Sequence, residues 1–148
     1  MASRVDWQGP QTMRRVNNII AQRLVAAATI VEGKMKTSMQ EPKTGRIYRK
    51  PYSTATHQAS APGESPAVRT ARLLNSITYD LPRKRGFTWS IRIGTNVKDE
   101  ITGFNYPFNL EFGFATRIAY VQPRPWGRPS LDNSLREIRA LFRVGRIT

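Results

Sequence analysis

The chain has 148 residues, and its 24 lysines and arginines outnumber its 10 acidic residues, giving a net charge of +14. This length predicts one domain over residues 1–148, able to bury roughly 70% of its unfolded surface. The absence of cysteine excludes disulfides and thiolate metal sites. We expect no membrane partner, because no apolar run reaches the roughly 18 residues that a spanning helix needs. The charge favours an acidic or polyanionic partner.

Residues 1–11 are expected to form a loose N-terminal arm that contains Trp7, and a helix is predicted over residues 13–36. Apolar residues recur there at spacings of three and four, which is typical of a helix with one buried face. The run of alanines at 26–28 would let this helix lie close to a sheet or to another helix. The apolar positions are Val16, Ile20, Leu24, Ala27 or Ala28, Val31 and Met35.

Residues 37–70, here called the assembly arm, show almost no periodicity and are rich in small, polar and basic residues. Such a segment cannot bury enough surface to fold alone, so we expect it to become ordered against a neighbouring subunit. The stretch TGRIYRK (44–50) is a candidate short strand or hairpin. His57 is the only histidine. No ligand cluster or nucleophile accompanies it, so no metal, cofactor or catalytic site is predicted.

A helical turn is expected over residues 71–78, followed by two antiparallel strands at 77–81 and 87–95 with their tip at Pro82–Gly86. Apolar and polar residues alternate along the second strand, as in a half-buried strand. The basic tip residues are either a solvated turn or a contact with DNA or an acidic neighbour. These residues are Arg83, Lys84 and Arg85.

The stretch YPFNLEFG also alternates, so a strand is predicted at 106–113, with a short edge segment at 117–122. The aromatic side chains of both strands are expected in the core, namely Phe87, Trp89, Phe108 and Phe112. Glu111 would lie on the polar face and form an ion pair with an arginine. A basic, proline-rich elbow (residues 122–129) then leads into a final helix from Pro129 to Arg143.

Together these elements predict an α+β fold. It has an N-terminal helix, a mostly antiparallel sheet of three to four strands, a C-terminal helix packed on the sheet, and a long extended loop at 37–70. Exposed strand edges and the arm favour assembly into a ring. No Walker loop, GxGxxG or HExxH motif occurs, so an enzyme is not expected.

Four stretches occur in an order that resembles a known family: TGRIYRK (44–50), HQASAPGESPA (57–67), ARLLNSI (71–77), and EFG followed by PRPWGRPSL (111–131). They resemble the tail-completion, or neck, proteins of long-tailed bacteriophages, over roughly residues 44 to 135. Many members have an Asp-Thr-Gly-Arg-Leu turn where this chain has Arg69, Thr70, Ala71, Arg72 and Leu73. The acid and the glycine are both replaced in this chain, and alanine tolerates a positive φ badly, so the turn departs from the family pattern here.

The resemblance implies a structural virion protein, made in the host bacterial cytoplasm and located in the neck at the head–tail junction. It would form a ring, most often a hexamer, between a head-side connector or stopper protein and a tail terminator or tail tube protein. Genomic DNA would pass through the lumen without specific binding. A tail terminator, head-closure or minor head protein is an alternative. A non-specific basic DNA-binding protein is the alternative from another class.

Contacts between subunits or rings are assigned to the assembly arm and the elbow, although the elbow is alternatively only a connector between a strand and a helix. The arm candidates are Arg46, Tyr48, Arg49, His57, Pro62, Gly63 and Pro66. The elbow candidates are Arg124, Pro125, Trp126 and Arg128. Arg83, Lys84 and Arg85 are the candidates for a surface facing DNA in the channel.

Overall fold

The computed structural model describes residues 8–50, 52–98 and 102–143, and it confirms the α+β class. The helices are α1 (Gly9–Gln40), α2 (Arg72–Ser76), α3 (Tyr106–Phe112) and α4 (Gly127–Arg143). The strands form antiparallel pairs rather than one sheet. These are β1 (Ile47–Arg49) with β2 (Thr56–Gln58), β3 (Thr78–Tyr79) with β6 (Ile93–Gly94), β4 (Arg83–Arg85) with β5 (Thr88–Ser90), and β7 (Phe114–Ala115) with β8 (Tyr120–Val121).

The long helix α1 extends beyond the predicted 13–36 at both ends. It begins at Gly9, and Pro10 occupies the first turn, where a missing N–H group costs nothing. Residues 9–11 are therefore helical rather than part of a loose arm, and residues 1–7 with Trp7 lie outside the described part. At the other end Met39 is buried and continues the apolar stripe.

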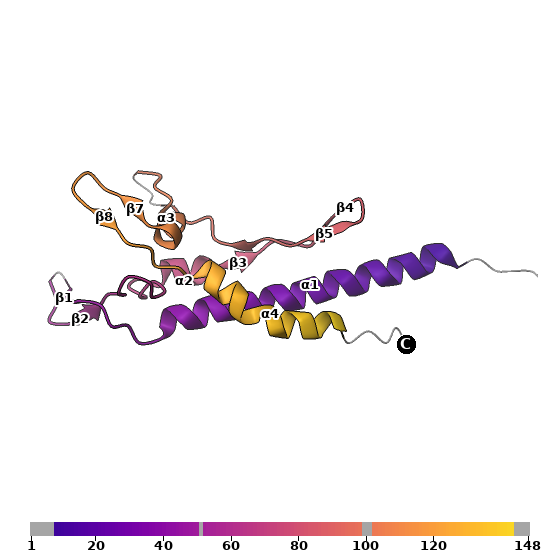
Figure 1. Ribbon diagram of the computed structural model, residues 1–148, viewed down its shortest axis with the longest axis horizontal. Helices are drawn as coiled ribbons and strands as arrows, with labels where there is room; N and C mark the ends of the chain where they lie inside the picture. The colour runs from indigo at the N-terminus through magenta and orange to yellow at the C-terminus, as the bar shows by residue number, and fades with distance from the viewer. Residues whose placement is uncertain (1–7, 51, 99–101, 144–148) are drawn as a thin grey trace, which may run out of the picture.

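Helix α4 packs against α1, where the sequence predicted packing on a sheet (Figure 1). Both helices bury small side chains: Ala27 and Ala28 on α1, and Ser130 and Ser134 on α4. The two buried serine hydroxyls donate to the carbonyl oxygens of Trp126 and Ser130, at 2.6 and 2.7 Å, so they stay hydrogen-bonded inside the protein. Small, satisfied side chains allow the two helices to approach closely.

The core is centred on one side of α1 and is small. Its buried members are Val31, Met35, Met39, Ile77 and Trp126. Four half-buried apolar residues pack against them, namely Leu73, Leu74, Ile93 and Ile138. Four separate elements thus share one core, because α1, α4, the α2–β3 junction and the β3–β6 pair all contribute to it.

The antiparallel pairing of the segments at 77–81 and 87–95 is confirmed, but the predicted tip at Pro82–Gly86 is wrong, because Arg83–Arg85 is itself strand β4 and lengthens the ribbon. Thr78 pairs with Gly94 at its base and Arg85 with Thr88 near its end. The turn itself is Gly86–Phe87, and Gly86 has a φ of +57°. A glycine at the first central position is typical of two-residue hairpin turns of type II′.

The predicted strand at 106–113 is wrong: Tyr106–Phe112 is helix α3. Apolar residues that alternate over seven positions also fall four apart, so this short stretch fits both periods. Local chemistry decides in favour of the helix. The Asn105 side chain accepts a hydrogen bond from the Phe108 N–H at 3.3 Å, Pro107 lies in the first turn, and Gly113 ends the helix at a φ of +75°.

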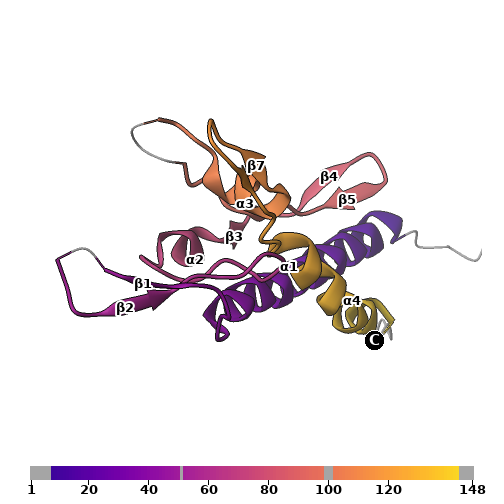
Figure 2. The ribbon, with the colours of Figure 1, turned by 60° about the vertical axis from the view of Figure 1, so that its left-hand side comes forward.

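The molecule is elongated, and three hairpins project from the body formed by α1 and α4 (Figures 1 and 2). The accessible surface is 11,610 Å², whereas a compact monomer of this mass exposes about 7,700 Å². At full extension the 16 residues outside the described part would contribute only about 2,600 Å². The shape therefore leaves much surface for contacts with other molecules.

Candidate assembly surfaces

An aromatic surface lies on helix α3, the residues just before it and the β7–β8 hairpin. It is defined here by the exposed Phe104, Phe108, Phe112 and Tyr120 and the half-buried Phe114. Phe108 and Phe112 lie one helical turn apart with ring centroids at 4.8 Å, and both side chains are 59% exposed. Phe104 and Phe114 meet edge to face at 5.3 Å. Adjacent exposed aromatic groups are typical of a protein contact surface.

This surface corrects the prediction that strand aromatics fill the core. As part of helix α3, Phe108 and Phe112 stay mostly exposed and line an open groove beside Pro107 and Trp126. Phe87 is fully exposed because it occupies the hairpin turn, and Trp89 is half-buried. Trp126 is the aromatic residue that enters the core.

A single carboxylate fixes α3 to the start of α4. Glu111 accepts hydrogen bonds from the N–H groups of Trp126, Gly127 and Arg128, at 2.7, 2.9 and 2.9 Å. These N–H groups lie at the start of α4 and have no partner within the helix, and the negative charge suits this end of the helix dipole. The predicted ion pair between Glu111 and an arginine is therefore wrong.

Two further bonds hold the same junction. The Trp126 indole N–H donates to the Pro107 carbonyl at 3.3 Å, and the Arg124 N–H donates to the Leu110 carbonyl at 2.6 Å. The aromatic surface is thus carried on a short helix that is bonded firmly to the core.

The structure brings part of the assembly arm against the elbow. The Gly63 N–H donates to the Pro123 carbonyl at 2.9 Å, and Arg124 Nε donates to the Ser60 carbonyl at 3.2 Å. Pro66 is buried, whereas Pro62 is exposed. Residues 59–66 therefore belong to the body of this chain, although they were predicted to order only against a neighbour.

A second carboxylate closes the base of the arm. Glu64 accepts from the Thr44 hydroxyl at 2.6 Å and from the N–H groups of Ala61 and Thr44, at 2.8 and 3.2 Å. The Thr44 hydroxyl contributes most to lowering the pKa of Glu64 below its usual value, and the two N–H groups act in the same direction. The two ends of the β1–β2 segment are thereby held together.

The β1–β2 hairpin itself projects away from the body (Figure 2). It carries Arg46, Tyr48, Arg49 and His57, with Tyr48 opposite His57 in the register. Tyr52 at its turn is fully exposed, and no residue of either strand is buried. An isolated two-stranded hairpin is at best marginally stable in water, so a partner surface would stabilise it.

The elbow candidates separate into internal and accessible residues. Trp126 is in the core and the Arg124 side chain bonds within the chain, so neither is a free contact group here. The Pro125 side chain is half-buried, and Arg128 is exposed beside the Glu111 carboxylate.

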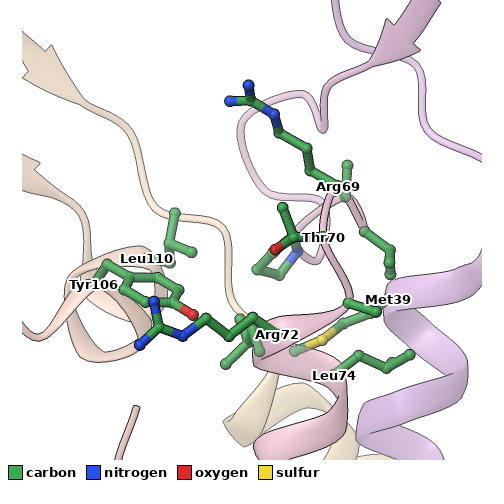
Figure 3. Close-up of a pocket in the computed structure, with 12 residues that line it drawn as sticks. Met39, Arg69, Thr70, Arg72, Leu74, Tyr106 and Leu110 are labelled. Atoms are coloured by element: carbon green, nitrogen blue, oxygen red, sulfur yellow. The ribbon is translucent and has the colours of Figure 1, made fainter. Parts of the chain in front are cut away.

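A pocket of about 270 Å³ lies where α2, α3 and the end of α1 meet (Figure 3). Met39, Leu74 and Leu110 line it, and the Arg72 side chain extends toward Tyr106. Burial raises the pKa of Tyr106, and the Arg72 charge opposes that rise. No carboxylate or histidine is among its lining residues, so this pocket offers space for an apolar group rather than acid–base chemistry.

Within the described ranges, no three His, Asp or Glu residues gather in a way that could hold a metal ion. None of the described helices is both long and apolar enough to cross a membrane. A scan against protein-family models and searches of curated proteins and solved structures found no match.

Sequence reasoning missed the aromatic surface and the role of Glu111, and a signal was present only for the first. Asn105 followed by Pro107 is a helix-start signal that would have placed Phe108 and Phe112 one turn apart. Nothing local in the sequence pairs Glu111 with residues 126–128, because that contact depends on how the chain folds back.

Proposed function

We propose that this chain is a structural subunit of a tailed bacteriophage, forming a ring in the neck between head and tail. The assignment to the neck rests on the ordered motifs between residues 44 and 135. The exposed aromatic surface is the observation that carries the assembly role. Three projecting hairpins and a surface too large for a compact monomer support it.

The energy available from the aromatic surface is appropriate for subunit contacts. Each aromatic side chain buries about 150–250 Å² when covered, and buried apolar area contributes about 25 cal/mol per Å². Covering Phe108 and Phe112 alone would therefore supply several kcal/mol. A ring would gain this free energy of association at every boundary between subunits.

Location is tested by cryo-electron microscopy of the particle that contains this chain. We expect a closed ring at the head–tail junction, with the aromatic surface of each subunit against its neighbour or against the next ring. Absence of the chain from the purified particle would contradict the neck assignment.

The aromatic surface is tested by the double variant Phe108→Ser, Phe112→Ser in a complementation assay for infectious particles. We expect the variant to fold but to leave heads and tails unjoined, since the contact loses its apolar area. Phe142→Ser is the matched control: Phe142 is 42% exposed on α4, away from this surface. Normal particle yield from the double variant would refute the proposed contact.

A further inference from the structure

Two segments that lie near each other in the fold carry positive charge and no acidic residue. Residues 8–31 and 81–98 contain eight lysines and arginines and no acidic residue. The first acid along α1 is Glu32, which pairs with Lys36. Elsewhere the described acids are largely engaged inside the chain, as with Glu137 and Lys34 at 3.0 Å. These two segments therefore contribute only positive charge of their own to the surface.

The fold places these two segments side by side. At the base of the β-ribbon, the Thr29 hydroxyl bonds to the Tyr79 hydroxyl at 3.2 Å, and near the tip Lys84 Nζ donates to Asn17 Oδ1 at 3.0 Å. The ribbon thus follows α1 for about 18 Å, given a rise of about 1.5 Å per helical residue. The β4–β5 hairpin and the first half of α1 form one end of the molecule (Figure 1).

We call this the basic end and define it by Arg14, Arg15, Arg83, Lys84 and Arg85. Lys84 faces α1 and lies 5.8 Å from the Trp89 ring centroid. Arg83 and Arg85 alternate with it and lie on the opposite face of the strand. Arg14 and Arg15 are exposed on α1, within one turn of Asn17, the residue that Lys84 contacts.

Among the described residues, one acid is ion-paired with the arginines at the base of this hairpin. Asp80, at the base of the hairpin, pairs with Arg92 at 2.7 Å and with Arg83 at 4.0 Å. The Phe87 side chain is fully exposed at the turn between the basic strand β4 and the uncharged strand β5. The last turn of α4, which carries Arg143, lies toward the same end (Figure 1).

We propose that the basic end binds the phosphate backbone of a nucleic acid. Its exposed cations outnumber the single carboxylate of Asp80 beside them, and such an excess of exposed positive charge suits the repeated phosphates of a polyanion. An exposed aromatic ring among cations suits stacking on unpaired bases. This inference concerns the isolated chain, so its test is independent of the proposal that the chain forms a ring in the neck.

The test is fluorescence anisotropy of the purified full chain with a labelled duplex and a single strand, each of about 25 nucleotides in length, between about 50 and 200 mM salt. We expect the triple variant Arg83→Gln, Lys84→Gln, Arg85→Gln to weaken binding at least about tenfold and to lower the salt slope by about 2–3. The matched control is Arg46→Gln, Arg49→Gln, Lys50→Gln, which removes the same charge from the β1–β2 hairpin and should change binding little.

Each other outcome has a defined meaning. Equal losses from both triple variants, or no binding by the natural chain at the lowest salt, would overturn the proposal. Binding to an acidic protein from the particle but not to nucleic acid would also overturn it. Phe87→Ala separates the two nucleic-acid forms, since it should weaken binding to the single strand and leave duplex binding unchanged.

Discussion

Glu111 connects two helices through one carboxylate, and its removal should show the strength of that junction. We expect Glu111→Ala to lower the free energy of unfolding by about 2–4 kcal/mol, because three helix-terminal N–H groups lose a charged acceptor. The free energy of unfolding of Glu111→Gln should lie between those of the natural chain and Glu111→Ala, since glutamine keeps an acceptor oxygen without the charge. Urea unfolding measures both.

The control for this prediction is Glu137→Ala. Its ion pair with Lys34 is about half exposed, and such pairs contribute less than about 1 kcal/mol. If Glu111→Ala costs no more than this control, the carboxylate does not hold the junction.

In the turn at 69–73, Ala71 occupies a backbone conformation that glycine adopts more easily. Its φ is +56° at the start of α2, in the left-handed region that a Cβ disfavours. Ala71→Gly should therefore stabilise the chain by about 1 kcal/mol. Ala61→Gly, at a residue without positive φ, should instead destabilise it. A lower urea midpoint for Ala71→Gly would contradict this prediction.

Glu64 makes part of the stability depend on pH. Its pKa in the folded chain lies below the usual 4.5, so the charged form is favoured by folding. That stability is fully present above the usual pKa and is lost as the pH falls through the folded pKa. Thr44→Val, which removes the largest contribution, should raise the pKa of Glu64 in an NMR titration. An unchanged titration would exclude the hydroxyl as the cause.

At the scale of elements, one glycine in α1 and one at the end of α3 should respond in opposite ways to substitution by alanine. A Cβ on Gly33, within α1, would meet nothing within 4 Å, so Gly33→Ala should stabilise by about 0.5–1 kcal/mol. A Cβ on Gly113 would lie 2.8 Å from the Val121 carbonyl at a φ of +75°, so Gly113→Ala should cost about 2–3 kcal/mol. Thermal unfolding should show a higher melting temperature for Gly33→Ala and a lower one for Gly113→Ala. A higher melting temperature for Gly113→Ala would contradict the described backbone at the end of α3 and its close contact with β8.

Elements were predictable where the sequence pattern was long or unambiguous. The stripe on α1 runs over many turns, and the segments of β3 and β6 were paired correctly, although the turn between them was placed at Pro82–Gly86 instead of Gly86–Phe87. Helix α3 was mistaken for a strand because Phe108, Leu110 and Phe112 satisfy both periods over seven residues. That one error also moved two phenylalanines from the surface into a predicted core.

At the scale of the whole molecule, the projecting β1–β2 hairpin should be ordered by its partners. In the purified chain its amides should exchange with deuterium much faster than those near Val31 and Met35, because neither strand buries a residue. Within the particle they should become protected. Mass spectrometry of both samples measures this, and strong protection in the isolated chain would contradict a docking role.

The sequence by itself determined the α+β class, the long first helix, the last helix, the central ribbon and the excess of positive charge. Each of these depends on local periodicity, turn residues or composition. Only the tertiary structure decided that α4 packs on α1, that Glu111 meets residues 126–128, that residues 59–66 lie on the elbow, and that Arg83–Arg85 adjoin α1. These contacts join residues far apart in the chain. Which residues meet depends on how the elements pack around the small core, and local sequence patterns do not specify that packing.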